Sequence, residues 1–120
     1  MNESILVSIK KLLGITEEYT HFDADIIMHI NSVFFVLWQL GVGPSAPFMI
    51  EDDSYTWDDF LTDNTNFELV KSYMYMKVRL MFDPPLSSTV IDSMKRMIDE
   101  YEWRLNVAAE SNGEEVNQNG

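Results

Sequence analysis

The sequence contains no cysteine, which excludes disulfide bridges, thiolate zinc sites and cysteine nucleophiles together. Basic residues are also scarce, because Lys and Arg number 8 against 20 Asp and Glu and the formal net charge is -12. Such a surface repels phosphate groups, since proteins bind nucleic acid mainly by displacing counterions with basic side chains. The same charge disfavours docking on anionic membranes. We therefore expect neither specific nucleic-acid binding nor membrane binding.

Long hydrophobic runs are absent as well. The longest strongly apolar stretch, Val33 to Trp38, lies in a segment that polar residues such as His29 and Asn31 interrupt. It falls short of the roughly 18 uncharged apolar residues that a membrane span needs. With 120 residues, of which 46% are hydrophobic, the chain has the size and composition of one globular domain with one core.

The apolar residues that are present recur at helical spacing in five segments. They predict helices over residues 3–13, 22–40 and 56–61, a fourth from Thr65 to the Asp83-Pro84-Pro85 stop, and a fifth from residue 88 to at least 105. Gly14 and Gly41 are expected terminators of the first two. Three capping boxes are expected, and their residue pairs are Thr20 with Asp23, Thr56 with Asp59, and Thr65 with Glu68.

The predicted fold is therefore all-α, a small bundle of about four to five helices. One long loop, at about residues 41–55, carries apolar residues near its middle that a purely solvated linker would not need. After residue 109 the composition becomes polar and acidic, which predicts a flexible C-terminal tail. We expect a helical domain over residues 1–109 and the tail over residues 110–120.

No recognised catalytic motif is present in the sequence. It contains no nucleophile elbow, no glycine loop for phosphates and no zinc-protease signature. His21, Asp23, Asp25 and His29 lie close together, but helix capping and an i,i+4 contact explain them better than a metal site does. No acidic run has the glycine of a calcium-binding loop. We expect no enzymatic activity, no catalytic residues, no cofactor and no metal.

A cluster of acidic residues lies between the long loop and the fourth helix. Two interpretations are open: a solvated face that also caps helices, or an acidic surface that meets a basic partner or repels DNA. The first is favoured. The candidate residues of a DNA-repelling surface are Glu51, Asp52, Asp53, Asp58, Asp59 and Asp63.

Some large apolar residues have no obvious place in the core. The second helix is apolar nearly all round in its C-terminal half, which indicates burial on every side by the core or by a partner. Because aromatic and methionine residues are enriched at protein–protein interfaces, we select such residues as interface candidates. They are Phe35, Phe48, Met49, Ile50, Trp57 and Trp103.

Several segments, in order, resemble short prophage proteins of Gram-positive bacteria known as head–tail connector, or adaptor, proteins of tailed phages. The resemblance extends over residues 5–109 and involves no catalytic signature. The segments are FDADIIMHINSVF (residues 22–34), LGVGP (40–44), VKSY (70–73), KVRL (77–80), FDPP (82–85) and EWRLN (102–106).

The resemblance implies a structural virion protein at the head–tail junction, made in the host cytoplasm before assembly. Its implied partners are the portal protein, a stopper or neck protein, and further copies of itself in a ring of about twelve, whose heterologous interface closes on itself. DNA would pass through the lumen without specific binding. The alternatives are another neck or tail-completion protein, and an adaptor outside the virion that binds a host or regulatory protein.

Overall fold

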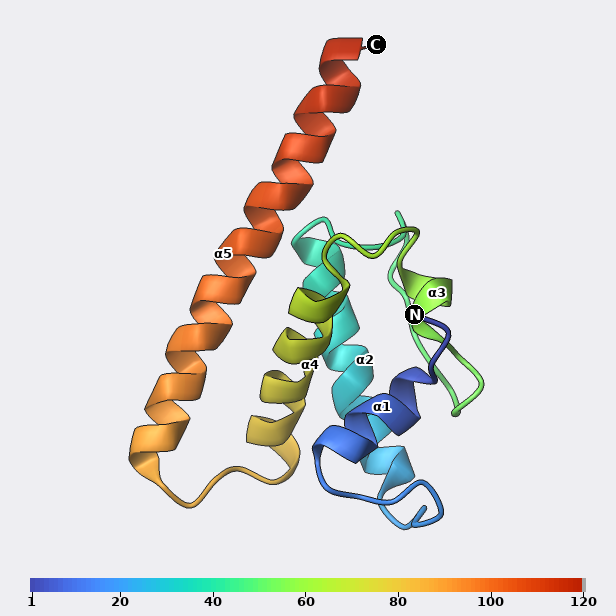
Figure 1. The fold of residues 1–120 in the computed structure, drawn as a ribbon, viewed down its shortest axis with the longest axis vertical. Coiled ribbons are helices and arrows are strands. Elements are labelled where there is room, and N and C mark those ends of the chain that lie inside the picture. Colours follow the sequence, from blue (N-terminus) through green and yellow to red (C-terminus); the bar gives the residue numbers. More distant parts are fainter. Residues whose placement is uncertain (120) are drawn as a thin grey trace.

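The computed structural model describes residues 1–119, with side chains for residues 1–111. It contains five helices and, within the described residues, no strand beyond one isolated bridge between Ser4 and Thr56 (Figure 1). The predicted all-α bundle is confirmed. The helices are α1 (Ile5–Leu12), α2 (Asp23–Gln39), α3 (Trp57–Phe60), α4 (Phe67–Phe82) and α5 (Ser88–Asn119).

The ends of the helices follow from local sequence at several positions. The Ser4 hydroxyl accepts a hydrogen bond from the Val7 amide at 3.2 Å and caps α1. Gly14 and Gly41 have φ values of 81° and 85°, so the predicted left-handed terminators of α1 and α2 are confirmed. The Asp59 carboxylate accepts from the Thr56 amide at 2.8 Å, in the expected capping arrangement at α3.

Two of the predicted capping boxes are wrong. The N-cap of α2 is Phe22, which makes no side-chain cap, and the Asp23 carboxylate instead pairs with the Lys10 ammonium at 2.8 Å. The N-cap of α4 is Asn66, and the Thr65 amide donates to the Asp63 carboxylate at 2.9 Å. At α2 the Lys10 ammonium takes the Asp23 side chain, and at α4 the Asp63 carboxylate takes the Thr65 amide that the capping pattern assigns to Glu68.

The helix α4 occupies the centre of the molecule. It packs against α2 and against α5, and α1 packs against both α2 and α4 (Figure 1). The extents are 49 × 35 × 19 Å, so the body is only about two helix diameters thick. A body this thin cannot cover both faces of every helix. The core includes Ile5, Ile9, Ile26, Ile30, Phe34, Leu37, Trp57, Val70, Tyr73, Met74, Val78, Ile98 and Leu105.

The long helix α5 contacts the body along one side only. Ile98 and Leu105 are buried against the core, and the Asn106 amide donates to the Leu40 carbonyl at 3.4 Å. Figure 1 shows α5 running on past the rest of the bundle. Residue 120 and the side chains from residue 112 lie outside the described residues, so the flexible tail expected over residues 110–120 stays a prediction.

Lys10 has a structural role in the fold. Its side chain is only 2% exposed, and its ammonium donates to the Glu17 carbonyl at 3.1 Å as well as pairing with Asp23. A lysine in the last turn of a helix is ordinarily explained by the helix dipole, which favours cations there. The structure shows instead that Lys10 fastens the connection between α1 and α2 to the body.

Candidate protein-interaction surfaces

The long loop follows a fixed course along α2. The Asn31 side chain forms two hydrogen bonds with the backbone of Ile50, donating to its carbonyl at 3.0 Å and accepting from its amide at 2.8 Å. Two turns further along the helix, the Trp38 indole donates to the Ser45 carbonyl at 2.9 Å. The loop therefore runs antiparallel to α2, and the side chain of Met49 stays exposed beside it.

An exposed apolar surface lies on the side of α2 that faces away from the core. Phe35 is next to the buried Phe34, and its ring lies 5.5 Å from that of Trp38. From α4, the Met81 sulfur comes within 4.0 Å of the Ser32 hydroxyl on the same side of α2. Exposed fractions range from 38% for Trp38 to 64% for Met49. We call this surface the α2 face; its residues are Met28, Phe35, Trp38, Met49 and Met81.

A second exposed apolar surface lies on α5. Trp103 is 67% exposed, and it is two residues from the buried Leu105, which places it about 200° around the helix. Because Leu105 and Ile98 face the core, Trp103 projects away from α4, and Val107 is exposed one turn further on. We call Trp103 and Val107 the α5 face.

Three of the candidate interface residues serve the core instead of the surface. Ile50 and Trp57 are buried, which corrects their predicted interface role: in this fold they cannot contact a partner. Phe48 is half-buried, with its ring 4.9 Å from Phe34 and 5.3 Å from Phe60. Of the six candidates, Phe35, Met49 and Trp103 are the ones that the structure leaves exposed.

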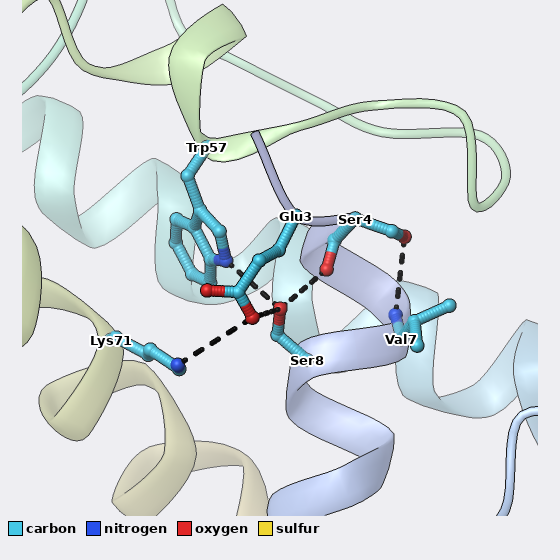
Figure 2. A network of polar contacts seen from close by, with 6 residues as sticks. All are labelled: Glu3, Ser4, Val7, Ser8, Trp57 and Lys71. Atoms are coloured by element: carbon cyan, nitrogen blue, oxygen red, sulfur yellow. Dashed lines mark hydrogen bonds and ion pairs between the residues drawn. The ribbon is translucent and has the colours of Figure 1, made fainter. Parts of the chain in front are cut away.

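The burial of Trp57 depends on a polar network at the N-terminus of α1, shown in Figure 2. The Trp57 indole donates to the Ser8 hydroxyl at 3.2 Å, and that hydroxyl donates to the Ser4 carbonyl at 2.6 Å. The Glu3 carboxylate lies 3.3 Å from Ser8 and 3.9 Å from the Lys71 ammonium. A buried indole needs such an acceptor, and because Ser8 is 49 residues away from Trp57 in the chain, sequence spacing does not reveal it.

The acidic candidates form an exposed surface on the loop and α3. Glu51, Asp52, Asp53, Asp58, Asp59 and Asp63 are all exposed, and within the described part of the chain none of them pairs with a basic side chain. We call these six residues the acidic surface.

Hydrogen bonds hold two of these carboxylates in the ionised form. The Ser54 hydroxyl, and then its amide, lower the pKa of Asp52 below the ordinary value. The Thr65 amide does the same for the pKa of Asp63. Asp52 and Asp63 therefore keep their negative charge to a lower pH than an ordinary aspartate.

Charge is separated along the chain. Between residues 12 and 70 there is no Lys or Arg, although this part contains the acidic surface and all of α2. Of the 8 basic residues, all but Lys10 and Lys11 lie on α4 and α5. The α2 face thus has acidic neighbours, such as Asp25 and Glu51, and neither α2 nor the long loop contributes a basic side chain to it.

The neighbouring residues His21, Asp23, Asp25 and His29 do not form a metal-binding cluster in the structure. Asp23 is taken by Lys10, and the His21 ring packs at 4.7 Å on Phe22. Across the described residues, no group of three or more His, Asp or Glu side chains is arranged to hold a metal ion. The same part of the chain has no helix that is both long and apolar enough to span a membrane.

The fold and its surfaces are those of a small helical protein that exposes several separate apolar and acidic surfaces. A family model described as phage connector protein matches residues 5–112, and the chain belongs to this family. The resemblance seen in the sequence is thereby confirmed. No curated protein and no solved structure matches the chain. Family membership gives the protein the general role of a phage head–tail connector, which contacts other head or tail proteins.

Proposed function

We propose that the chain is a structural, non-enzymatic protein of the phage neck that forms a closed ring between the portal and the stopper or tail. The family match over residues 5–112 carries this proposal. A ring of about twelve copies is the expected assembly, because a heterologous interface closes when its rotation divides a full turn. The chain would reside at the head–tail junction after assembly in the cytoplasm of a Gram-positive host.

The separation of the exposed surfaces supports a ring. A subunit in a ring needs two different lateral surfaces, one for each neighbour. The α2 face and the α5 face lie on helices that pack against α4 and project away from the core. The C-terminal part of the chain, and the part of the long loop outside the α2 face, would then be available to the portal and the stopper.

The acidic surface supports the passage of DNA through the ring. Exposed carboxylates without basic partners repel the phosphate backbone, so DNA can move past them without binding. We propose that the acidic surface faces the lumen. An arrangement with these residues on the outer side of the ring would contradict this part of the proposal.

The experiment is gold labelling of the chain on intact virions, viewed by electron microscopy. An antibody against the full chain should label only the junction of head and tail. Label on the tail tip or the capsid would favour another virion protein. If an accessible epitope gives no label, an adaptor outside the virion becomes the better interpretation. Disrupted particles, in which the neck is open, serve as the control for accessibility.

A further inference from the structure

We propose that the α2 face of one copy binds the α5 face of the next copy, and that this contact is the lateral interface of the assembly. The inference rests on the proposed ring, and it adds which surfaces meet. The occupant of the α2 face is thus a second copy of this chain, with Trp103 as the residue that anchors it.

The positions of the two faces favour a head-to-tail contact. Both α2 and α5 pack against α4, and each face lies on the side of its helix that the core leaves open. A copy that binds through α5 therefore keeps its own α2 face free for the next one. Repetition of one such contact produces a ring or a filament, whereas a face that binds itself stops at a dimer.

Charge argues against pairing of the α2 face with itself. Its neighbours Asp25 and Glu51 would be brought toward the acidic face of the other copy, and α2 and the long loop contain no Lys or Arg to offset them. Like charges brought together across an interface oppose association.

The α5 side offers the complementary charge. In the described part of the chain, Lys95 and Arg96 form no ion pair, and Arg96 lies two turns before Trp103 on the same side of the helix. Asp92 and Asp99 lie on this side too, so the α5 side is mixed in charge, whereas α2 and the long loop contain acids and no Lys or Arg. The α5 face thus presents cations to the acids that α2 and the loop place around the α2 face.

The chemistry of the two faces also matches. Tryptophan is among the residues that most often dominate binding energy at interfaces, and flexible methionines adapt their shape to an aromatic ring. The Trp38 indole is fixed by Ser45 and packs on Phe35, so the receiving surface loses little freedom on binding. Met28, Met49 and Met81 add adaptable exposed side chains to the same face.

Cysteine cross-linking tests the contact, because the chain has no cysteine of its own. The variants Gln39→Cys and Asp99→Cys place one thiol a turn from Phe35 and one a turn from Trp103, and leave both anchors intact. When the two full-length variants are mixed with a short bismaleimide, we expect heterodimer to form at least about tenfold faster than when either variant is mixed with a Leu86→Cys control. The thiol of that control lies outside both faces, so the hot-spot contact does not bring it near its partner. Equal rates for the control pairs would overturn the proposal.

A mixing experiment separates this contact from other modes of association. Phe35→Asp blocks the α2 face and Trp103→Asp blocks the α5 face, with Leu86→Asp as the folded control at a residue that is exposed outside both faces. Each blocked variant should stay monomeric in sedimentation, and their mixture should give a 1:1 dimer and nothing larger. The pairing is contradicted if either blocked variant assembles as the unmodified chain does. It is also contradicted if the mixture of folded variants gives no dimer and the cysteine variants give no cross-link. If gold labelling places the chain at the head–tail junction and either of these tests fails, the proposed function stands and only this interface is rejected.

Discussion

The part of the molecule before α4 and the hairpin of α4 and α5 are stabilised in different ways. In the first part, irregular segments are fastened by polar groups: Lys10 to the connection before α2, Asn31 to the long loop, and Ser8 to Trp57. The two long helices of the hairpin pack through apolar side chains, and their i,i+4 pairs, such as Arg104 with Glu100, are exposed. Exposed pairs contribute little. Irregular segments need specific partners because their backbone groups are not satisfied by a helix.

The largest effect is expected from Lys10→Met. The substitution leaves the Asp23 carboxylate and the Glu17 carbonyl without their buried partner. Breaking a fully buried pair costs roughly 3–5 kcal/mol, and because Asp23 is partly exposed we expect a loss of about 2–3 kcal/mol in the free energy of unfolding. Urea denaturation measures it. Lys11→Met, at an exposed neighbour, is the control and should change stability by less than about 0.5 kcal/mol; equal effects would contradict the role of Lys10.

A somewhat smaller loss is expected from Asn31→Leu, which removes both hydrogen bonds to Ile50. Unpaired backbone groups at a half-buried site should cost about 1–2 kcal/mol. Hydrogen exchange at the Ile50 amide should also accelerate, because the loop loses an attachment to α2. Gln39→Leu, on the exposed side of the same helix, should leave that exchange unchanged. If both variants exchange alike, the loop is held by other contacts.

Trp57→Phe should cost about 1–2 kcal/mol, because it removes the indole donor and part of a buried ring. The matched change Trp103→Phe, at an exposed site, should leave the stability of the monomer within about 0.5 kcal/mol. Thermal unfolding of the two variants compares them directly. A loss at Trp103 as large as that at Trp57 would mean that the α5 face is part of the core.

The smallest effect on stability at neutral pH is expected from Tyr73→Phe in α4. Its hydroxyl is buried and, among the described residues, has no hydrogen-bond partner. Burial, and then the Glu102 carboxylate, raise the pKa of Tyr73 above its ordinary value. The unfolded chain thus ionises first, so the stability held by neutral Tyr73 is complete below about pH 10 and is lost as pH rises beyond it. Tyr73→Phe should flatten the fall in stability above that pH; an unchanged alkaline limb would contradict this assignment.

The same contrast explains what could be predicted from the sequence. Apolar periodicity predicted α2, α4 and α5, and Gly14, Gly41 and Pro84 marked where helices end. Phe35 stood out because it helps to make the C-terminal half of α2 apolar nearly all round, and Trp103 because it lies away from the apolar stripe of α5. The polar attachments were not predictable, since Asn31 and Ile50 are 19 residues apart and Ser8 and Trp57 are 49 apart. Such pairs exist only once the fold brings them together, and for that reason the sequence alone places Trp57 among the interface candidates.

The most direct test of the account is a cryo-electron microscopy reconstruction of the neck of virions that carry this chain. The account predicts a ring of this fold between portal and tail, with α2 of each copy against α5 of its neighbour and the acidic surface toward the channel. A neck whose density contains no copy of this helical fold would contradict the connector ring.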